Sequence, residues 1–243
     1  MNHRIGWYAM VAVATGVLAQ EMGTEALRIR LDGGLPVHLE NRLTGEVLPA
    51  TADPKTLALV WYQRSLTPSA PVAVTPQAGG KQIGVLFEGD DASRCETTYA
   101  AQADGTVMVT QSGQSERAGL YGVQWGVSGL DAAAVTVIVP GMSGVAFGKD
   151  DAPFSSLSFS WPIEWEAGMV LLQMGKGGFL IWADDPDMRF KSLLLDQVRG
   201  RFGLRFQTQN HAPFTESRSA TSVSWRLQAY AGDWRVGAEI YRR

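Results

Sequence analysis

The chain contains 243 residues, of which 45% are hydrophobic, and this composition supports one large domain with a sizeable core. The formal net charge of −3 argues against a nucleic-acid partner, which would favour a basic surface. Cys95 is the single cysteine, so no disulfide can form within the chain and the fold must rest on burial and backbone hydrogen bonds. We expect Cys95 to be a buried, unreactive thiol.

Residues 1–19 have the order of a secretory signal peptide. His3 and Arg4 precede an apolar run, and Val17 and Ala19 occupy the small-residue positions before a cleavage site. We therefore expect cleavage after Ala19 and a secreted or periplasmic protein. The apolar run has about 15 residues, fewer than the roughly 20 that span a bilayer, so no membrane partner is predicted. An uncleaved anchor is the alternative.

Alternating apolar and polar residues, typical of strands with one buried face, recur through the rest of the chain. Residues 27–31 alternate, Gly33 and Gly34 offer a turn, and residues 35–40 return as a second strand. A second reversal is expected at Thr44-Gly45. The same pattern predicts further strands at 57–64, 82–88, 94–100, 106–111, 120–127, 134–139, 155–161, 169–174, 179–183, 188–195, 201–207 and 222–229.

More than a dozen strands with almost no helical periodicity predict an all-β fold of stacked antiparallel sheets. The proline-rich segment 67–80 is the best candidate for a linker, but strands of similar character flank it. One domain over residues 20–232 is therefore favoured.

Residues 233–243 depart from the β pattern. Asp233 can cap a helix, and Trp234, Ala238 and Tyr241 follow at i, i+4 and i+7 spacing. A helix of roughly two and a half turns is marginal unless its apolar face packs on something. Trp234 and Tyr241 either dock back on the sandwich or pack against a second domain that begins here, and we expect the second.

The segment from Tyr230 to Trp234, with Ala238 and Tyr241, resembles the junction in bacterial multidomain glycosidases where a galactose-mutarotase-like β-supersandwich leads to a (β/α)8 barrel. Similar segments occur in the same order at 35–46 with Asn41 and Thr44-Gly45-Glu46, at Val139-Pro140-Gly141 with Gly144, and at Gly177-Gly178 followed by Ala183-Asp184-Asp185-Pro186. The resemblance covers almost the whole chain after residue 19. It implies a large antiparallel β-supersandwich with a short C-terminal helix.

The resemblance also implies that the catalytic carboxylates lie in a C-terminal barrel, a partner domain that this chain lacks. We therefore predict no catalytic residue here. The expected function is that of a non-catalytic N-terminal domain of a secreted glycoside hydrolase, which packs against the barrel through Trp234 and Tyr241 and contributes to carbohydrate binding.

Five residues are candidates for contact with carbohydrate: Trp161, Glu164, Trp165, Asp184 and Asp185. Tryptophan faces can stack on pyranose rings, and carboxylates can accept hydrogen bonds from sugar hydroxyls. Glu164 and Glu166 would share one strand face if the segment were extended. The alternative is that these residues form the rim of a turn with half-buried tryptophans.

The sequence Asp184-Asp185-Pro186-Asp187 offers the oxygen ligands that calcium prefers. A turn preset by Pro186 explains it more simply, because the remaining ligand spacing of a calcium loop is missing. No metal or cofactor is predicted.

Two other functions stay open at this point. Eight tryptophans in the sequence are compatible with a free-standing carbohydrate-binding module. A mutarotase-like sugar epimerase would need an acid and a base around the sugar ring, and only His38 and His211 remain as histidines after residue 19.

Overall fold

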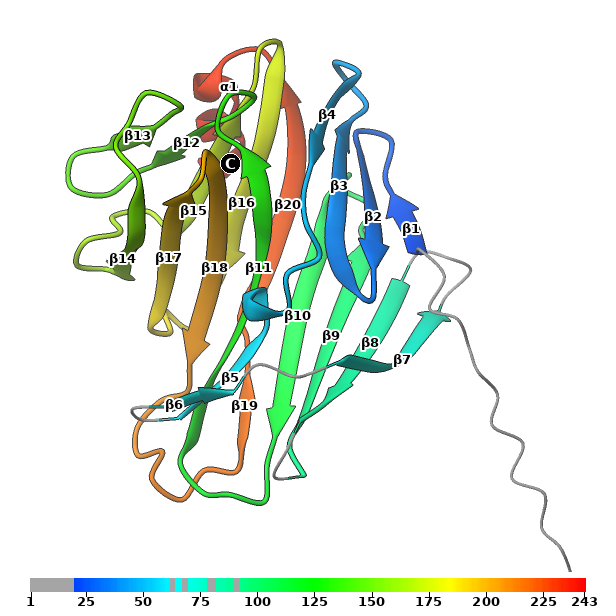
Figure 1. Ribbon diagram of the computed structural model, residues 1–243, viewed down its shortest axis with the longest axis vertical. Coiled ribbons are helices and arrows are strands. Elements are labelled where there is room, and N and C mark those ends of the chain that lie inside the picture. The colour runs from blue at the N-terminus through cyan, green and yellow to red at the C-terminus, as the bar shows by residue number, and fades with distance from the viewer. Residues whose placement is uncertain (1–19, 62–63, 67–69, 78–81, 90–91) are drawn as a thin grey trace, which may run out of the picture.

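The computed structural model describes residues 20–61, 64–66, 70–77, 82–89 and 92–243, and at 64–66 and 70–77 it describes the backbone. The predicted signal peptide, residues 1–19, lies outside the described residues. The described chain forms antiparallel strands in three sheets, a short 3-10 helix η1 (Pro54–Thr56) and one α-helix α1 (Trp234–Tyr241) (Figure 1). The predicted all-β fold with a short C-terminal helix is confirmed.

The first sheet has four strands in chain order: β1 (Gln20–Gly23), β2 (Leu27–Asp32), β3 (Leu35–Asn41) and β4 (Glu46–Pro49). The six-stranded sheet has the order β14 (Phe154–Trp161), β17 (Lys191–Val198), β18 (Arg201–Gln209), β11 (Leu120–Asp131), β5 (Ala58–Trp61) and β6 (Arg64–Leu66).

The ten-stranded sheet has the order β13 (Val145–Phe147), β12 (Thr136–Val139), β15 (Met169–Gln173), β16 (Gly177–Asp184), β20 (Ser224–Ala231), β10 (Val107–Gln114), β9 (Arg94–Ala101), β8 (Gln82–Glu88) and β7 (Ala70–Gln77), with β19 (Ser219–Thr221) paired to β10. The four-stranded and six-stranded sheets both lie on one side of this large sheet (Figure 1). A single core cluster draws buried residues from all three sheets.

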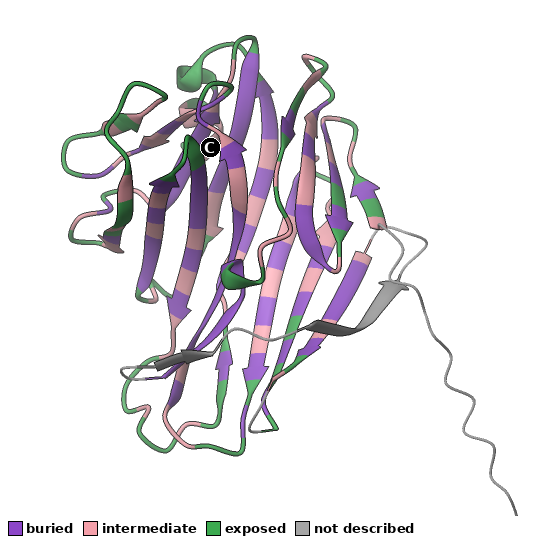
Figure 2. Ribbon diagram, in the orientation of Figure 1, coloured by how far each residue is buried: buried purple, intermediate pink, exposed green. Residues whose placement is uncertain are grey.

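In many strands, buried and more exposed residues alternate between the core and the outer face of the sheet (Figure 2). Along β18, Phe202, Leu204 and Phe206 are buried in the core, whereas Gly203 and Arg205 belong to the outer face. The centre of the core is aromatic. Trp125 stacks on Phe206 with ring centroids 5.1 Å apart, and these rings pack with Trp165 and Trp225.

The turn at Gly33 and Gly34 forms as predicted. Both glycines have positive φ, at 54° and 78°, and Asp32 pairs with Leu35 across the two-residue loop. A positive φ at both positions favours glycine because it has no Cβ.

The described part of segment 67–80, the best linker candidate in the sequence, is a strand. Residues 70–77 form β7, which pairs with β8 at the edge of the ten-stranded sheet. Pro71 and Pro76 have no N–H to donate, and an edge strand tolerates this because one of its sides has no partner strand. Residues 67–69 and 78–80 lie outside the described residues.

Helix α1 begins where the sequence predicts. Asp233 is its N-cap, and the carboxylate accepts a hydrogen bond from the backbone N–H of Arg235 at 3.0 Å. The helix contacts β15, β16 and β20 on the outer face of the ten-stranded sheet. In the described part of the chain, no helix has the length and apolar character needed to cross a membrane.

Candidate functional site

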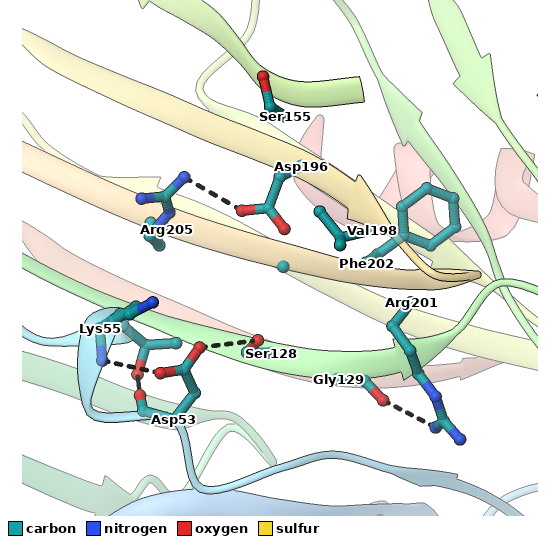
Figure 3. Close-up of a pocket in the computed structure, with 12 residues that line it drawn as sticks. Asp53, Lys55, Ser128, Gly129, Ser155, Asp196, Val198, Arg201, Phe202 and Arg205 are labelled. Atoms are coloured by element: carbon teal, nitrogen blue, oxygen red, sulfur yellow. Dashed lines mark hydrogen bonds and ion pairs between the residues drawn. The ribbon is translucent and has the colours of Figure 1, made fainter. Parts of the chain in front are cut away.

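A polar pocket of about 420 Å³ lies on the outer face of the six-stranded sheet (Figure 3). Strands β11, β17 and β18 and helix η1 position its charged and hydroxyl side chains, because the pocket residues alternate with residues of the core. The polar residues that line it are Asp53, Lys55, Thr56, Ser128, Ser155, Asp196, Arg201 and Arg205.

An ion pair lies at the centre of this pocket. Arg205 Nη2 donates a hydrogen bond to Asp196 Oδ2 at 3.1 Å, and each side chain is 25% exposed. Burial raises the pKa of Asp196. The positive charge of Arg205 opposes this effect, and the negative charge of Asp53 adds to it. Arg205 Nε is buried and has no hydrogen-bond partner in the structure.

Asp53 occupies the pocket wall opposite this pair. Its Oδ1 accepts from the backbone N–H of Lys55 at 3.0 Å and caps η1, and its Oδ2 accepts from Ser128 Oγ at 3.4 Å. Ser128 precedes a bulge in β11 at Gly129, where φ is +75°. The sequence does not predict this pocket, because the residues that line it come from four separate segments and carry no local motif.

Two of the predicted sugar-contact residues, Trp161 and Asp185, meet around a third residue, Lys191. The Lys191 ammonium lies 3.8 Å from the ring centroid of Trp161 and 2.7 Å from Asp185 Oδ2. The side chains of Lys191 and Asp185 are each 4% exposed. Burial lowers the pKa of Lys191, and the Asp185 carboxylate opposes that shift.

The predicted sugar contact of Asp185 is therefore corrected, because its carboxylate is buried in an ion pair. One face of the Trp161 ring is covered by the same ammonium. The cluster joins the end of β14 to the loop before β17.

Trp165 is also corrected as a sugar platform, because it is fully buried. Its ring stacks on Trp225 with centroids 6.2 Å apart, and its Nε1 donates to the backbone oxygen of Met169 at 2.9 Å. Trp61, Trp125 and Trp225 are buried as well, which leaves the free-standing binding-module hypothesis with few surface tryptophans among the described residues.

Glu164 and Glu166 do not share a strand face, because residues 162–168 form a turn. The backbone N–H of Glu164 donates to Ser160 O at 2.9 Å, and its carboxylate accepts from the N–H of Ser160 at 3.1 Å. The carboxylate of Glu166 accepts from the N–H of Ser143 at 3.0 Å in another loop. Each carboxylate thus accepts a backbone hydrogen bond that stabilises the local loop structure.

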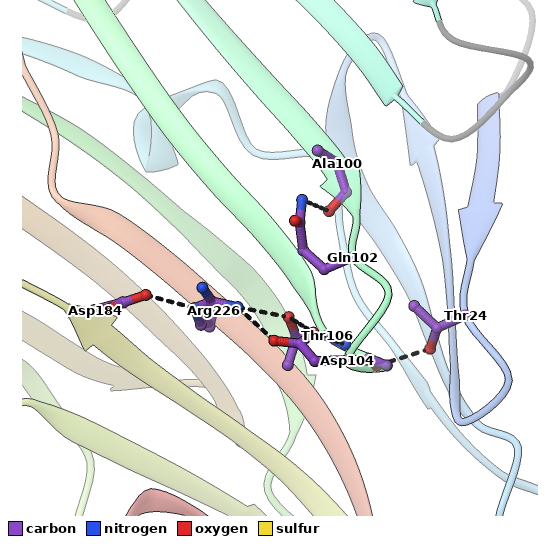
Figure 4. A network of polar contacts seen from close by, with 8 residues as sticks. Thr24, Ala100, Gln102, Asp104, Thr106, Asp184 and Arg226 are labelled. Carbon is purple, nitrogen blue, oxygen red and sulfur yellow. Dashed lines mark hydrogen bonds and ion pairs between the residues drawn. The ribbon is translucent and has the colours of Figure 1, made fainter.

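Asp184 joins a polar network on the outer face of the ten-stranded sheet (Figure 4). Arg226 lies between two carboxylates, 2.7 Å from Asp184 and 2.7 Å from Asp104. Burial acts to raise the pKa of Asp104, but hydrogen bonds from Thr106 and the charge of Arg226 outweigh it and lower that pKa. Asp184 therefore pairs with Arg226, and Asp185 pairs with Lys191. The two carboxylates do not face one metal ion together.

No three His, Cys, Asp or Glu side chains among the described residues are grouped so that they could hold a metal ion. The two histidines of the mutarotase hypothesis come from different sheets. His38 lies on β3 of the four-stranded sheet, whereas His211 follows β18 of the six-stranded sheet.

Three segments that carry the family resemblance meet at one end of the sandwich. The fully buried side chain of Asn41 donates hydrogen bonds to Gly178 O at 3.1 Å and to Tyr230 O at 2.7 Å. Glu46 Oε1 accepts from the N–H of Lys176 at 2.9 Å. We call this end, formed by residues 41–47, 174–178 and 230–236, the junction end.

Helix α1 leaves the junction end with one side on the sandwich and one side exposed. Gly237 is buried against the sheet, and Tyr241 is partly buried in a cluster with Leu171 and Tyr230. Trp234 is 47% exposed, and Val236 is exposed beside it. Tyr241 thus packs on the sandwich, whereas Trp234 is exposed.

No family model and no curated protein matches the sequence. Solved structures share its fold. The α-N-acetylgalactosaminidase NagBb from Bifidobacterium bifidum, solved as a quadruple mutant, matches 92% of this chain and 38% of its own, with a TM-score of 0.65 and 13% identity. The GH36 α-galactosidase AgaA from Geobacillus stearothermophilus matches 91% of this chain and 42% of its own, with a TM-score of 0.56 and 5% identity.

The 4-α-glucanotransferase from Thermococcus litoralis matches 88% of this chain and 38% of its own, with a TM-score of 0.50 and 10% identity. At these identities the likeness shows the fold alone. The predicted resemblance to a domain of glycoside hydrolases is confirmed at that level. The chain spans about two fifths of the length of the structures that it matches.

Proposed function

We propose that this chain is a non-catalytic β-supersandwich domain of a larger, exported glycoside hydrolase, and that its junction end packs against a catalytic domain. The observation that carries this proposal is the fold match, which covers nine tenths of this chain but about two fifths of two glycosidases. Export is proposed from the signal-like order of residues 1–19.

The exposed residues of the junction end support the packing role. Trp234 and Val236 on α1, and Leu43 and Val47 on the β3–β4 hairpin, are large apolar side chains that the described sandwich leaves uncovered. Exposed apolar groups gathered at one end are typical of an interaction surface. Asn41 fixes the hairpin to β16 and β20, so the surface is held in one arrangement.

The size of the native protein tests the first part of the proposal. We expect an antibody against this chain to isolate a protein with a mass well above that of 243 residues. A native species with the mass of residues 20–243 and no bound partner would contradict it.

Hydrogen exchange tests the second part. In the native protein, the backbone amides of α1 and the β3–β4 hairpin should exchange more slowly than in the separate chain, because a partner covers them. The variant Trp234→Ser should restore part of the fast exchange. The matched control Val198→Ser, which removes an exposed apolar side chain from a different hairpin, should leave the exchange at the junction end unchanged.

A further inference from the structure

We infer that the pocket between Asp53, Ser128, Asp196 and Arg205 is a binding site for a neutral sugar unit. The volume of about 420 Å³ falls within the range typical of small-molecule sites. Glycine at position 203 keeps the floor open, since a Cβ there would lie 2.9 Å from Asp196 Oδ1. The choice of sugars as ligands rests on the proposed function, but the geometry of the pocket does not.

The pocket places a hydrogen-bond donor beside an acceptor. Arg205 uses Nη2 to bind Asp196, while its Nε–H is buried without a partner. The Arg205 side chain as a whole is 25% exposed, so the accessible part of its guanidinium can donate to an oxygen in the pocket. A sugar hydroxyl can accept from the exposed part of the Arg205 guanidinium and donate to a carboxylate at the same time.

The charges of the pocket favour a neutral ligand. Asp196 already compensates Arg205, and Asp53 adds a second negative charge that acts on Asp196. The other two charged groups are the exposed cations Lys55 and Arg201. Lys55 partly offsets the effect of Asp53 on Asp196, and Arg201 donates to Gly129 O at 3.1 Å. An anionic ligand would therefore meet two carboxylates at the centre of the pocket.

Nuclear magnetic resonance of the chain tests the inference, with N-acetylgalactosamine, galactose and maltotriose as neutral probes and galacturonate as an anionic probe. We expect at least one neutral sugar to produce saturable shifts of the Arg205 Nε–H signal and of the amides of residues 128, 129, 203 and 205. The Nε–H signal is assigned by its loss in Arg205→Lys. That variant keeps the positive charge near Asp196 but lacks the Nε–H.

Arg205→Lys and Asp196→Asn should each weaken binding of the neutral sugar by about tenfold or more, as expected for a hydrogen bond to a charged group. The control Arg28→Gln changes an arginine of the four-stranded sheet, and binding should not change. Unfolding curves check that all three variants are folded.

Three results would overturn the inference: no saturable shift with any neutral sugar, shifts confined to residues outside the pocket, or tighter binding of galacturonate than of every neutral sugar. The proposed domain role is judged separately, by the mass and hydrogen exchange of the native protein. A large native protein whose pocket binds no sugar would leave that role intact and remove this site.

Discussion

The side-chain amide of Asn41 donates a hydrogen bond to the backbone oxygen of Tyr230, 189 positions later in the chain, at 2.7 Å. A second bond from the same nitrogen reaches Gly178 O at 3.1 Å. One buried side chain thus ties the four-stranded sheet to two adjacent strands of the ten-stranded sheet. Helix α1 begins at Trp234, only four positions after Tyr230.

Replacing Asn41 by leucine keeps the approximate volume but leaves two buried carbonyl oxygens without these donors. We expect the free energy of unfolding to fall by about 2–4 kcal/mol, since a buried unsatisfied group costs ~1–3 kcal/mol. Urea denaturation measures the change. Leu43→Ala in the same hairpin is the control, because Leu43 is exposed and its loss should cost less than about 0.5 kcal/mol.

The buried pair of Lys191 and Asp185 should behave as a unit. Lys191→Met or Asp185→Asn alone leaves one buried group without its charged partner, and we expect each to cost about 3–5 kcal/mol. The double variant should lose less than the sum of the two single losses, because it removes both charges. A double-mutant cycle from chemical denaturation gives the coupling energy. Additive losses would contradict the pairing.

Because α1 lies close to the sheet, we expect replacement of Gly237 by alanine to have the opposite of its usual effect on a helix. Alanine normally stabilises a helix by about 1 kcal/mol relative to glycine. At position 237, however, a Cβ would lie 2.5 Å from Leu171 Cδ2 and 2.8 Å from Tyr230 Cε1. We expect Gly237→Ala to lower the free energy of unfolding by about 1–2 kcal/mol, because overpacking costs ~1–3 kcal/mol.

Hydrogen exchange of α1 shows whether this loss is local to the helix. The control Val236→Ala removes an exposed side chain one position earlier and should leave the exchange unchanged. If Gly237→Ala stabilised the protein, the contact between α1 and β15 would be looser than described.

Asp196 should make the stability of the fold depend on pH in the acidic range. Its folded pKa is raised by burial, so the unfolded chain loses this proton first, at about pH 3.9. Relative to Asp196→Asn, the free energy of unfolding of the wild type should therefore fall as the pH rises from that value through the folded pKa. Denaturation at a series of pH values measures the difference.

Arg205→Gln provides the complementary test. The Arg205 charge lowers the pKa of Asp196, so its removal should raise that pKa further. Titration of the Asp196 carboxyl carbon by nuclear magnetic resonance reports this directly. An unchanged pKa would mean that the ion pair is not formed in solution.

The sequence predicts most of the fold because burial on one face imposes a period of two on each strand. The predicted strand at 82–88 coincides with β8, and the predicted start of the helix coincides with α1. The sequence pattern misleads where the position of a strand in its sheet matters more than its composition. Pro71 and Pro76 suggested a linker, but the edge position of β7 removes the need for a second set of hydrogen bonds.

The candidate sites could be predicted far less well. Trp161 and Trp165 are four residues apart and chemically alike, yet the turn after Trp161 sends Trp165 into the core. Asp184 and Asp185 are adjacent, yet they pair with cations on β20 and β17. Pairing between distant strands decides these outcomes, and no local pattern in the sequence reports it.

The position of β20 determines how the domain would respond to a mechanical load. Eight residues of β20 pair with β16, from Ala231 with Gly177 to Ser224 with Asp184, and β10 pairs along its other edge. A pulling force on α1 would first peel the helix from the sheet and then load β20 parallel to its own axis. The hydrogen bonds on both edges would then be sheared together, so the sandwich can act as a rigid anchor for whatever is attached to the helix.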